Sequence, residues 1–195
     1  GGLIGALWIR KLPTNTEMLY DAMIKNVHVA GRAYSELNTS DDTYDIYVGG
    51  AIGVFANPNY KRVTVSNIKV ENSIIESVGE KSMLTYAGGI VAGMWWSGTT
   101  ILNYGKVIDS AVISSSIAPS SYAGGIVGLM QVSNVNYCVV KDTEVRAMSE
   151  QNKAYAGGIA ARSKSSDTIR YSYSNASLRS QGSSTTNSVK YGIVA

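Results

Sequence analysis

A short phrase built around two consecutive glycines recurs along the chain, and it constrains the fold more than any other feature. The full copies read Tyr-x-Gly-Gly followed by small or aliphatic residues, and they begin at Tyr47, Tyr86, Tyr122 and Tyr155. The first glycines of the phrase stand at positions 1, 49, 88, 124 and 157, so successive copies are 48, 39, 36 and 33 residues apart. A fixed phrase at unequal spacing indicates a constant frame that carries loops of variable length.

The phrase divides the chain into similar units that together form one repeat domain. The approximate units are 1-46, 47-85, 86-121, 122-154 and 155-188, with the start of a further unit at 189-195. The paired glycines are expected to mark corners, where the backbone bends or approaches a neighbour closely. These structural positions are Gly49, Gly50, Gly88, Gly89, Gly124, Gly125, Gly157 and Gly158.

A second, weaker phrase follows each glycine phrase. Residues 24–33 align without gaps to residues 65–74 and to residues 169–178, while the copies at 101–112 and 135–145 carry two extra residues and one extra residue. Apolar and polar residues alternate here, as Ile68 and Val70 do with Lys69 and Glu71, which is the period of a strand. Each unit is therefore expected to hold three short strands.

Such short strands cannot bury a face alone, but they can when equivalent units stack. We therefore predict an all-β fold: a single-stranded, right-handed parallel β-helix of about five turns with three short strands per turn. Right-handed coiling is the default for parallel crossovers, and stacking at about 4.8 Å per turn gives a length of roughly 25 Å. The 20 glycines and the low charged fraction of 16% favour short strands and turns over helices.

Equivalent residues in such a coil lie above one another. Asn26, Asn67 and Asn103 are expected in one slot as a partial amide ladder, which Tyr137 and Tyr171 interrupt. The four phrase tyrosines are expected to stack, by packing rather than as a ligand platform. Ile90 and Val91 would point to opposite faces of a strand, and the sequence leaves open what covers the second face.

The phrase Gly-Gly-Ile-Val-Gly, most complete at residues 124–128, followed by Ile-x-Asn and a later Val, resembles the GLUG repeat of bacterial surface and secreted proteins. The resemblance covers nearly the whole chain, with Ala92, Ala161, Tyr171 and Tyr191 as departures. It implies a β-helical region of a large exported protein, such as an adhesin, or a region beside the catalytic part of an immunoglobulin A metallopeptidase. The repeat itself implies no active-site residue.

Charge and hydropathy exclude two classes of partner. The net charge is only +3, and the adjacent basic pairs Arg10-Lys11 and Lys61-Arg62 are isolated, so no stripe follows a phosphate backbone. No apolar run approaches the roughly 18 residues of a membrane span. The chain opens on Gly1 rather than methionine, so we expect a piece of a longer exported chain with flanking repeats or domains.

The sequence offers no catalytic set and calls for no cofactor. His28, the only histidine, stands in an alternating strand pattern, so neither a zinc pair nor a nucleophilic triad is available. Cys138, the only cysteine, is expected to be a small apolar core residue. The acidic residues are dispersed, against the paired carboxylates of a polysaccharide-cleaving β-helix.

Two features are weak binding candidates. Asp41, Asp42 and Asp45 form the one acidic cluster; a solvated loop is the favoured reading, and a calcium site is the alternative, because the closing glutamate of a calcium loop is missing. Trp95 and Trp96 are adjacent and cannot both face a core, so one of them is a possible ligand contact.

Three functions remain open at this stage. The preferred one is a non-enzymatic structural or adhesive segment of a bacterial cell-surface or secreted protein, with host or cell-surface glycans or proteins as possible partners. The alternatives are a carbohydrate-binding or carbohydrate-active β-helix module and an accessory region of a secreted metallopeptidase.

Overall fold

The described part of the chain consists of parallel strands and turns, without a helix. The computed structural model describes residues 2–8, 16–18, 23–25, 28–33, 45–56, 62–79, 84–95, 99–117, 119–164, 166–184 and 188–192. Each strand pairs in parallel with the strand five places later in the chain, so the strands form five sheets. This arrangement confirms the predicted all-β parallel solenoid.

We number the sheets I to V in the order in which the chain visits them. Sheet I contains β1 (Ile4–Trp8), β6 (Ile52–Ala56), β11 (Val91–Trp95), β16 (Val127–Met130) and β21 (Ala160–Ser163). Sheet II contains β2 (Thr16–Met18), β7 (Val63–Ser66), β12 (Thr100–Asn103), β17 (Ser133–Asn136) and β22 (Thr168–Arg170). Sheet III contains β3 (Met23–Lys25), β8 (Lys69–Glu71), β13 (Lys106–Ile108), β18 (Val139–Lys141) and β23 (Tyr173–Ser174). Sheet IV contains β4 (His28–Ala33), β9 (Ile74–Gly79), β14 (Ala111–Ser116), β19 (Glu144–Ser149) and β24 (Ser177–Gln181). Sheet V contains β5 (Ile46–Gly49), β10 (Thr85–Gly88), β15 (Ser121–Gly124), β20 (Ala154–Gly157) and β25 (Ser188–Tyr191).

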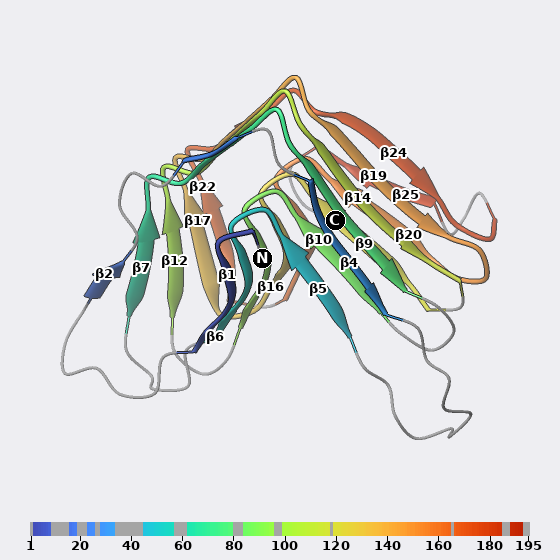
Figure 1. Ribbon diagram of the computed structural model, residues 1–195, viewed down its shortest axis with the longest axis horizontal. Helices are drawn as coiled ribbons and strands as arrows, with labels where there is room; N and C mark the ends of the chain where they lie inside the picture. Colours follow the sequence, from blue (N-terminus) through green and yellow to red (C-terminus); the bar gives the residue numbers. More distant parts are fainter. Residues whose placement is uncertain are drawn as a thin grey trace.

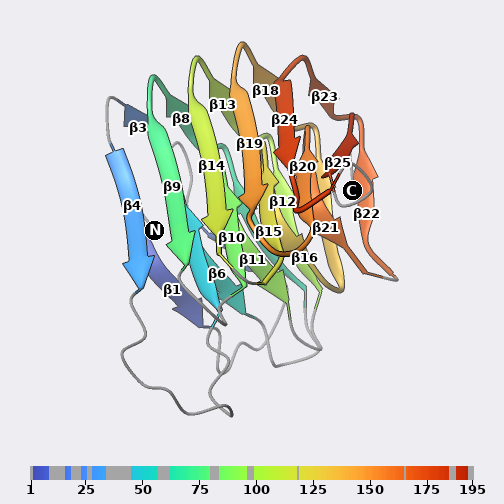
Figure 2. The same cartoon turned by 90° about the vertical axis from the view of Figure 1, so that its right-hand side faces the viewer.

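In cross-section the coil has two arms that meet at a ridge (Figure 1). Sheets I and II form one arm and sheets IV and V the other, with sheets I and V on the inner side. Sheet III lies along the ridge, and its strands stand beside the ordered row of sheet IV in the turned view (Figure 2). Three turns are bounded at both ends by a first glycine of the phrase, at 49–88, 88–124 and 124–157.

Each repeat contributes five strands, so the prediction of three strands per turn was too low. The glycine phrase is split by a bend into a strand of sheet V and a strand of sheet I, as at Gly88 and Val91. Left-handed residues divide the rest of the repeat, with a φ of 55° at Tyr104 and of 46° at Asp109. The sequence pattern shows apolar runs, but it does not show these sharp corners within them.

The glycines of the phrase lie in one row and are held there by close backbone approach. Gly88 pairs with Gly49 on one side and with Gly124 on the other. A Cβ on Gly88 would stand 1.9 Å from the carbonyl oxygen of Val91, and a Cβ on Gly89 would stand 2.1 Å from the carbonyl oxygen of Gly125 in the next turn. Neither distance leaves room for a side chain, which explains why the pair recurs.

The second phrase is in a different register from the one the sequence predicted. Val65 pairs with Leu102 rather than with Ile101, and Leu102 pairs with Val135. Ile24 lies opposite Val70 rather than Val65. In the observed register Ile75, Val112 and Val145 are equivalent, so these turns contain no inserted residue between sheets II and IV.

The core is one continuous cluster of aliphatic ladders between the sheets. Val70, Val107 and Val140 are fully buried and stacked in sheet III, and the other sheets supply similar rows. Ile90 and Val91 both belong to this core, because Ile90 lies in the bend and not on the strand. Neither residue therefore needs a cover outside the coil.

Candidate functional site

Four tyrosines of sheet V form a stack along the inner side of one arm, which we call the inner stack. It consists of Tyr47, Tyr86, Tyr122 and Tyr155, one from each copy of the phrase. Neighbouring ring centroids are 4.8, 4.8 and 4.9 Å apart, and the ring planes are tilted by at most 10°. The exposed fraction is only 2% for Tyr86 and 7% for Tyr122, so the centre of the stack is packed.

Trp95 closes the inner stack from the facing sheet I. Its ring lies over Gly93, where any Cβ would stand 2.0 Å from the indole, and its centroid is 4.7 Å from the ring of Tyr47. Gly93 pairs with Val54 and Leu129, so the indole fills the gap that the missing side chain leaves in this row. Trp95 is half-buried and packs against Tyr47, and Trp96 lies outside the described residues.

Arg162 continues the same row and faces the inner stack. Its Nη1 donates to the hydroxyl of Tyr86 at 3.3 Å, and its guanidinium carbon lies 5.4 Å from the ring centroid of Tyr122. Such a stacked cation contributes about 1 kcal/mol when it is partly exposed. Arg162 thus ties sheet I to sheet V across the inner side of the arms.

Asp45 lies beside the inner stack and accepts a hydrogen bond from it. The hydroxyl of Tyr47 donates to its Oδ2 at 2.8 Å. Burial raises the pKa of Tyr47, and the hydrogen bond to Asp45 raises it further. Asp41 and Asp42 lie outside the described residues, and within the described residues no three metal-ligating side chains come together.

A second row of tyrosines lies on the outside, at the corner between sheets II and III. We call Tyr104, Tyr137 and Tyr171 the outer stack. The ring centroids are 5.1 and 4.9 Å apart, with planes tilted by 15° and 11°. The exposed fractions are 49%, 45% and 76%, in contrast to the packed centre of the inner stack.

The predicted asparagine ladder is wrong, because tyrosines of the outer stack occupy the slot of Asn67 in the next turns. The slot holds Asn67, Tyr104, Tyr137 and Tyr171, all with a left-handed φ between 51° and 57°. Asn103 is one residue earlier, where it pairs with Asn136, whose Nδ2 donates to the Oδ1 of Asn103 at 3.0 Å. Asn26 lies outside the described residues. If Leu102 instead of Ile101 is aligned with Val65, Tyr104 falls in the slot that Asn67 and Tyr137 share. The sequence alone could therefore have predicted this neighbour.

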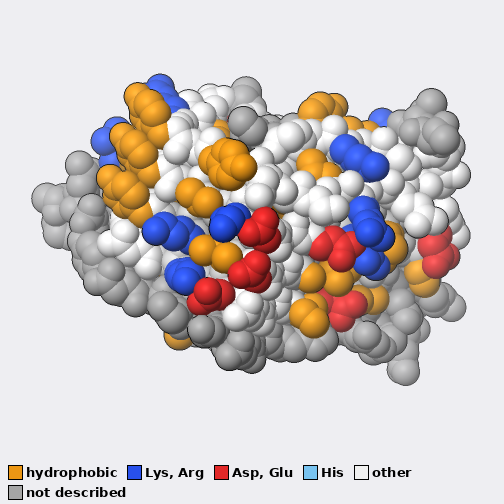
Figure 3. Space-filling view, turned by 90° about the horizontal axis from the view of Figure 1, so that it is seen from above, with side chains coloured by type: hydrophobic (Ala, Val, Ile, Leu, Met, Phe, Trp, Pro, Cys, Tyr) orange, Lys and Arg blue, Asp and Glu red, His pale blue; other side chains and the backbone are white. Residues whose placement is uncertain are grey.

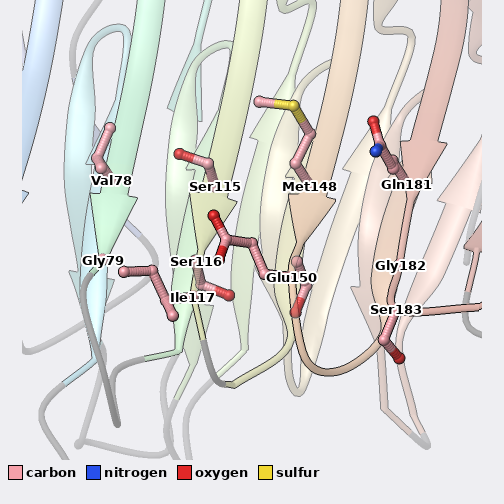
Figure 4. Close-up of a pocket in the computed structure, with 11 residues that line it drawn as sticks. Val78, Gly79, Ser115, Ser116, Ile117, Met148, Glu150, Gln181, Gly182 and Ser183 are labelled. Carbon is pink, nitrogen blue, oxygen red and sulfur yellow. The ribbon is translucent and has the colours of Figure 1, made fainter.

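An open groove of about 580 Å³ runs across the ends of the sheet IV strands (Figure 4). Its lining consists mainly of small or polar residues, with Met148 and Ile117 as the large apolar contributors. The hydroxyls of Ser116 and Ser149 both donate to the carbonyl of Pro119, so neither hydroxyl hydrogen is free to donate to a ligand. Glu150 is the one carboxylate of the lining, and hydrolysis of a glycosidic bond normally requires two carboxylates.

The ridge carries charges of both signs in close proximity. Seen from above, lysine and arginine side chains are interspersed with aspartate and glutamate (Figure 3). Lys69 pairs with Glu71 at 3.0 Å, and Arg146 pairs with Glu144 at 2.7 Å. This face therefore presents no continuous basic stripe of the kind that binds a phosphate backbone.

Cys138 and His28, whose residue types can act as a nucleophile and a base, lie in different turns of the coil. Cys138 is fully buried in the core, and burial raises the pKa of its thiol to about 12. A protonated, enclosed thiol is a poor nucleophile. His28 begins β4, and its backbone pairs with Ile74 in sheet IV.

No helix long and apolar enough to cross a membrane occurs among the described residues. Comparison with protein-family models, with curated proteins and with solved structures gives no match to this chain.

Proposed function

We propose that this chain is a non-enzymatic structural or adhesive repeat segment of a bacterial cell-surface or secreted protein, related to the GLUG repeats that its glycine phrase resembles. One observation carries the proposal. Equivalent positions stack without interruption in all five sheets, so the fold grows by adding turns and presents its surface residues as lines along the coil. A repeat of this kind is suited to spacing or display.

The distribution of reactive side chains supports the same proposal. Glu71 and Glu144 are engaged in ion pairs, the groove has a single carboxylate, and the described cysteine is enclosed. Seven of the described tyrosines are arranged in two stacks along the coil rather than around one cavity.

The finer description of the coil belongs to the proposal as well. We take it to be right-handed, because parallel crossovers almost always are, and to have about five turns, in keeping with five strands per sheet. Flanking repeats of the same polypeptide are the natural partners, because an unpaired strand edge favours pairing with another strand.

Surface display can be tested on cells of the producing organism. Antibodies raised against the folded chain should label intact cells or the culture medium, and protease added outside should remove the cell-bound label. An antigen found only after permeabilisation would contradict the proposal. Beads coated with the chain should bind host-cell surfaces more than albumin-coated beads if the role is adhesive, and equally if it is purely structural.

A carbohydrate-binding module is the second candidate, favoured by the open groove on sheet IV. Its lining of hydroxyl groups, an amide, a thioether and one carboxylate suits an extended neutral glycan better than an acidic one. Calorimetric titration with hexasaccharides of β-1,4-linked glucose or xylose tests it. Met148→Trp, which fills the groove, should abolish any binding, whereas Lys106→Gln on sheet III should not. Equal affinity for both variants would rule the groove out.

A further inference from the structure

We propose that the outer stack is a site of oxidative cross-linking, at which neighbouring tyrosines are joined by a carbon–carbon bond between consecutive turns. Three observations support this modification: the distance between the rings, their exposure, and the backbone that fixes them.

The rings are close enough to react without rearrangement of the coil. Tyr137 lies between Tyr104 and Tyr171, with centroids 5.1 and 4.9 Å away and nearly parallel planes. Parallel rings in register place like carbons of neighbouring rings at about the stacking distance. Rotation about the side-chain torsions of solvent-facing residues, which occurs in nanoseconds or less, then brings two ring edges into contact.

The backbone keeps the three rings on the outside of the coil. Each tyrosine has a left-handed φ, of 55°, 55° and 51° in chain order, which a bulky residue adopts at a cost of about 1–2 kcal/mol. Asn67 occupies the same slot in the preceding turn, with a φ of 57°, and asparagine tolerates this conformation better. The corner therefore does not require an aromatic residue, and yet three consecutive turns carry one.

The reaction is a two-electron oxidation of a pair of phenols. Each tyrosine loses one electron and its hydroxyl proton to give a phenoxyl radical, whose unpaired electron is shared with the ring carbons next to the C–O bond. Two such carbons form the new bond, and each then loses its hydrogen as the proton that restores the phenol. The oxidant is hydrogen peroxide acting through a haem peroxidase, and it is reduced to two molecules of water by the two electrons and two protons.

The inner stack provides an internal comparison. Its rings have a similar spacing, 4.8 to 4.9 Å, but its centre is almost fully buried, with Trp95 and Arg162 packed against the stack. An enzyme-sized oxidant reaches the outer stack and not the centre of the inner one. Proximity alone predicts cross-links in both stacks, whereas proximity with exposure predicts them in the outer stack only.

The cross-link would join residues that are 33 or 34 positions apart in the sequence but adjacent along the coil. Closing a loop of this size restricts the unfolded chain, as a disulfide does. The product is therefore expected to unfold at a higher temperature than the untreated protein.

The test treats the whole chain with a haem peroxidase and limiting peroxide at low protein concentration, followed by isolation of the monomer. We expect a mass loss of two hydrogens, dityrosine fluorescence, and tandem mass spectra that place the link at Tyr104–Tyr137 or Tyr137–Tyr171. Tyr137→Phe keeps a stacking ring but has no phenol, and it should lose most of the intramolecular product. Tyr173→Phe, which removes an exposed tyrosine outside the stack, should leave the yield unchanged.

Three results would overturn the proposal: a link that maps to the inner stack, a product that forms only between molecules, or a full yield in Tyr137→Phe. Circular dichroism of each variant before oxidation shows whether the coil is intact. If Tyr137→Phe does not fold, Tyr104→Phe and Tyr171→Phe supply the same answer, because each should lose only its own link.

Discussion

At the scale of single residues, the coil depends on glycine positions where a Cβ atom would not fit. In the four full copies of the phrase, the first glycine faces a carbonyl oxygen three residues later in the chain, and the second faces the backbone of the next turn. Backbone atoms cannot move aside as the end of a long side chain can. These glycines are therefore required for reasons of space rather than of φ, because none of the described glycines has a left-handed backbone.

Gly88→Ala should consequently be strongly destabilising. The new methyl group would overlap the carbonyl of Val91, and overpacking of this kind costs about 3 kcal/mol or more. Gly5→Ala is the matched control, since a Cβ there meets nothing within 4 Å, and it should change the unfolding free energy by about 0.5 kcal/mol or less. Urea denaturation of both variants measures the difference. Equal stability of the two variants would refute this explanation.

Because of the inner stack, the free energy of unfolding is expected to fall as the pH rises in the alkaline range. Burial, followed by the charge of Asp45, raises the pKa of Tyr86 to about 12, from 10 in the unfolded chain. The folded state therefore holds the proton more tightly, so the contribution is complete below pH 10 and is lost as the pH rises towards 12. The loss for this residue is on the order of 2 kcal/mol.

Thermal unfolding followed between pH 9 and pH 12 should show this decline. In Tyr86→Phe the decline should be smaller, and one late-titrating tyrosine should disappear from the ultraviolet absorbance of tyrosinate. An unchanged profile in the variant would assign the alkaline sensitivity to other groups.

At the scale of strands and sheets, hydroxyl groups connect sheet IV to sheet V inside the second arm. Ser114 accepts hydrogen bonds from Ser77 at 3.1 Å and from Ser121 at 2.9 Å, and it donates towards Thr85. All four residues are completely buried. The connection joins successive turns as well as two sheets.

Ser114→Ala should therefore cost about 1–3 kcal/mol, because it leaves buried donors without an acceptor. Ser115→Ala, one position later on the outer face of the same strand, should cost far less. Chemical denaturation of the two variants side by side distinguishes them. A small effect of Ser114→Ala would mean that the neighbouring hydroxyls find other partners.

Much of this arrangement could be read from the sequence, and the failures have identifiable causes. The glycine phrase gave the correct register for sheets I and V because its paired glycines recur at positions where a side chain would meet backbone atoms. The second phrase was misaligned by one residue because Ile101 and Leu102 are both aliphatic and both buried, so hydropathy does not distinguish them. The outer stack was missed for the same reason, although Tyr137 and Tyr171 were already placed in one slot.

The positions of the tryptophan and the arginine were beyond sequence reasoning. Trp95 reaches its place only because Gly93 leaves a gap in a row that Val54 and Leu129 otherwise fill. Arg162 contacts Tyr86, which is 76 residues away in the chain. Both contacts depend on how the two arms face each other, and no local pattern encodes that.

At the scale of the whole molecule, one turn should be removable. Gly88 and Gly124 are equivalent in consecutive turns, so excision of residues 89–124 joins Gly88 to Gly125, which takes the place of Gly89. The shortened protein should keep its β-type circular dichroism and unfold cooperatively at a lower temperature, because each turn is stabilised mainly by its neighbours. Excision of residues 89–106 joins a strand of sheet V to sheet III and should prevent folding. If both deletions gave disordered chains, stability would not be a sum over turns.

The repeats differ in length mainly between sheets I and II and between sheets IV and V. From sheet II to sheet IV the distance is ten residues in three consecutive turns, from Val65 to Ile75, Leu102 to Val112 and Val135 to Val145. From sheet I to sheet II it changes, with ten residues from Phe55 to Val65 and five from Met130 to Val135. Copies of a foreign peptide grafted between sheets I and II of successive turns would thus be spaced one turn apart. The coil could then serve as a scaffold for periodic presentation.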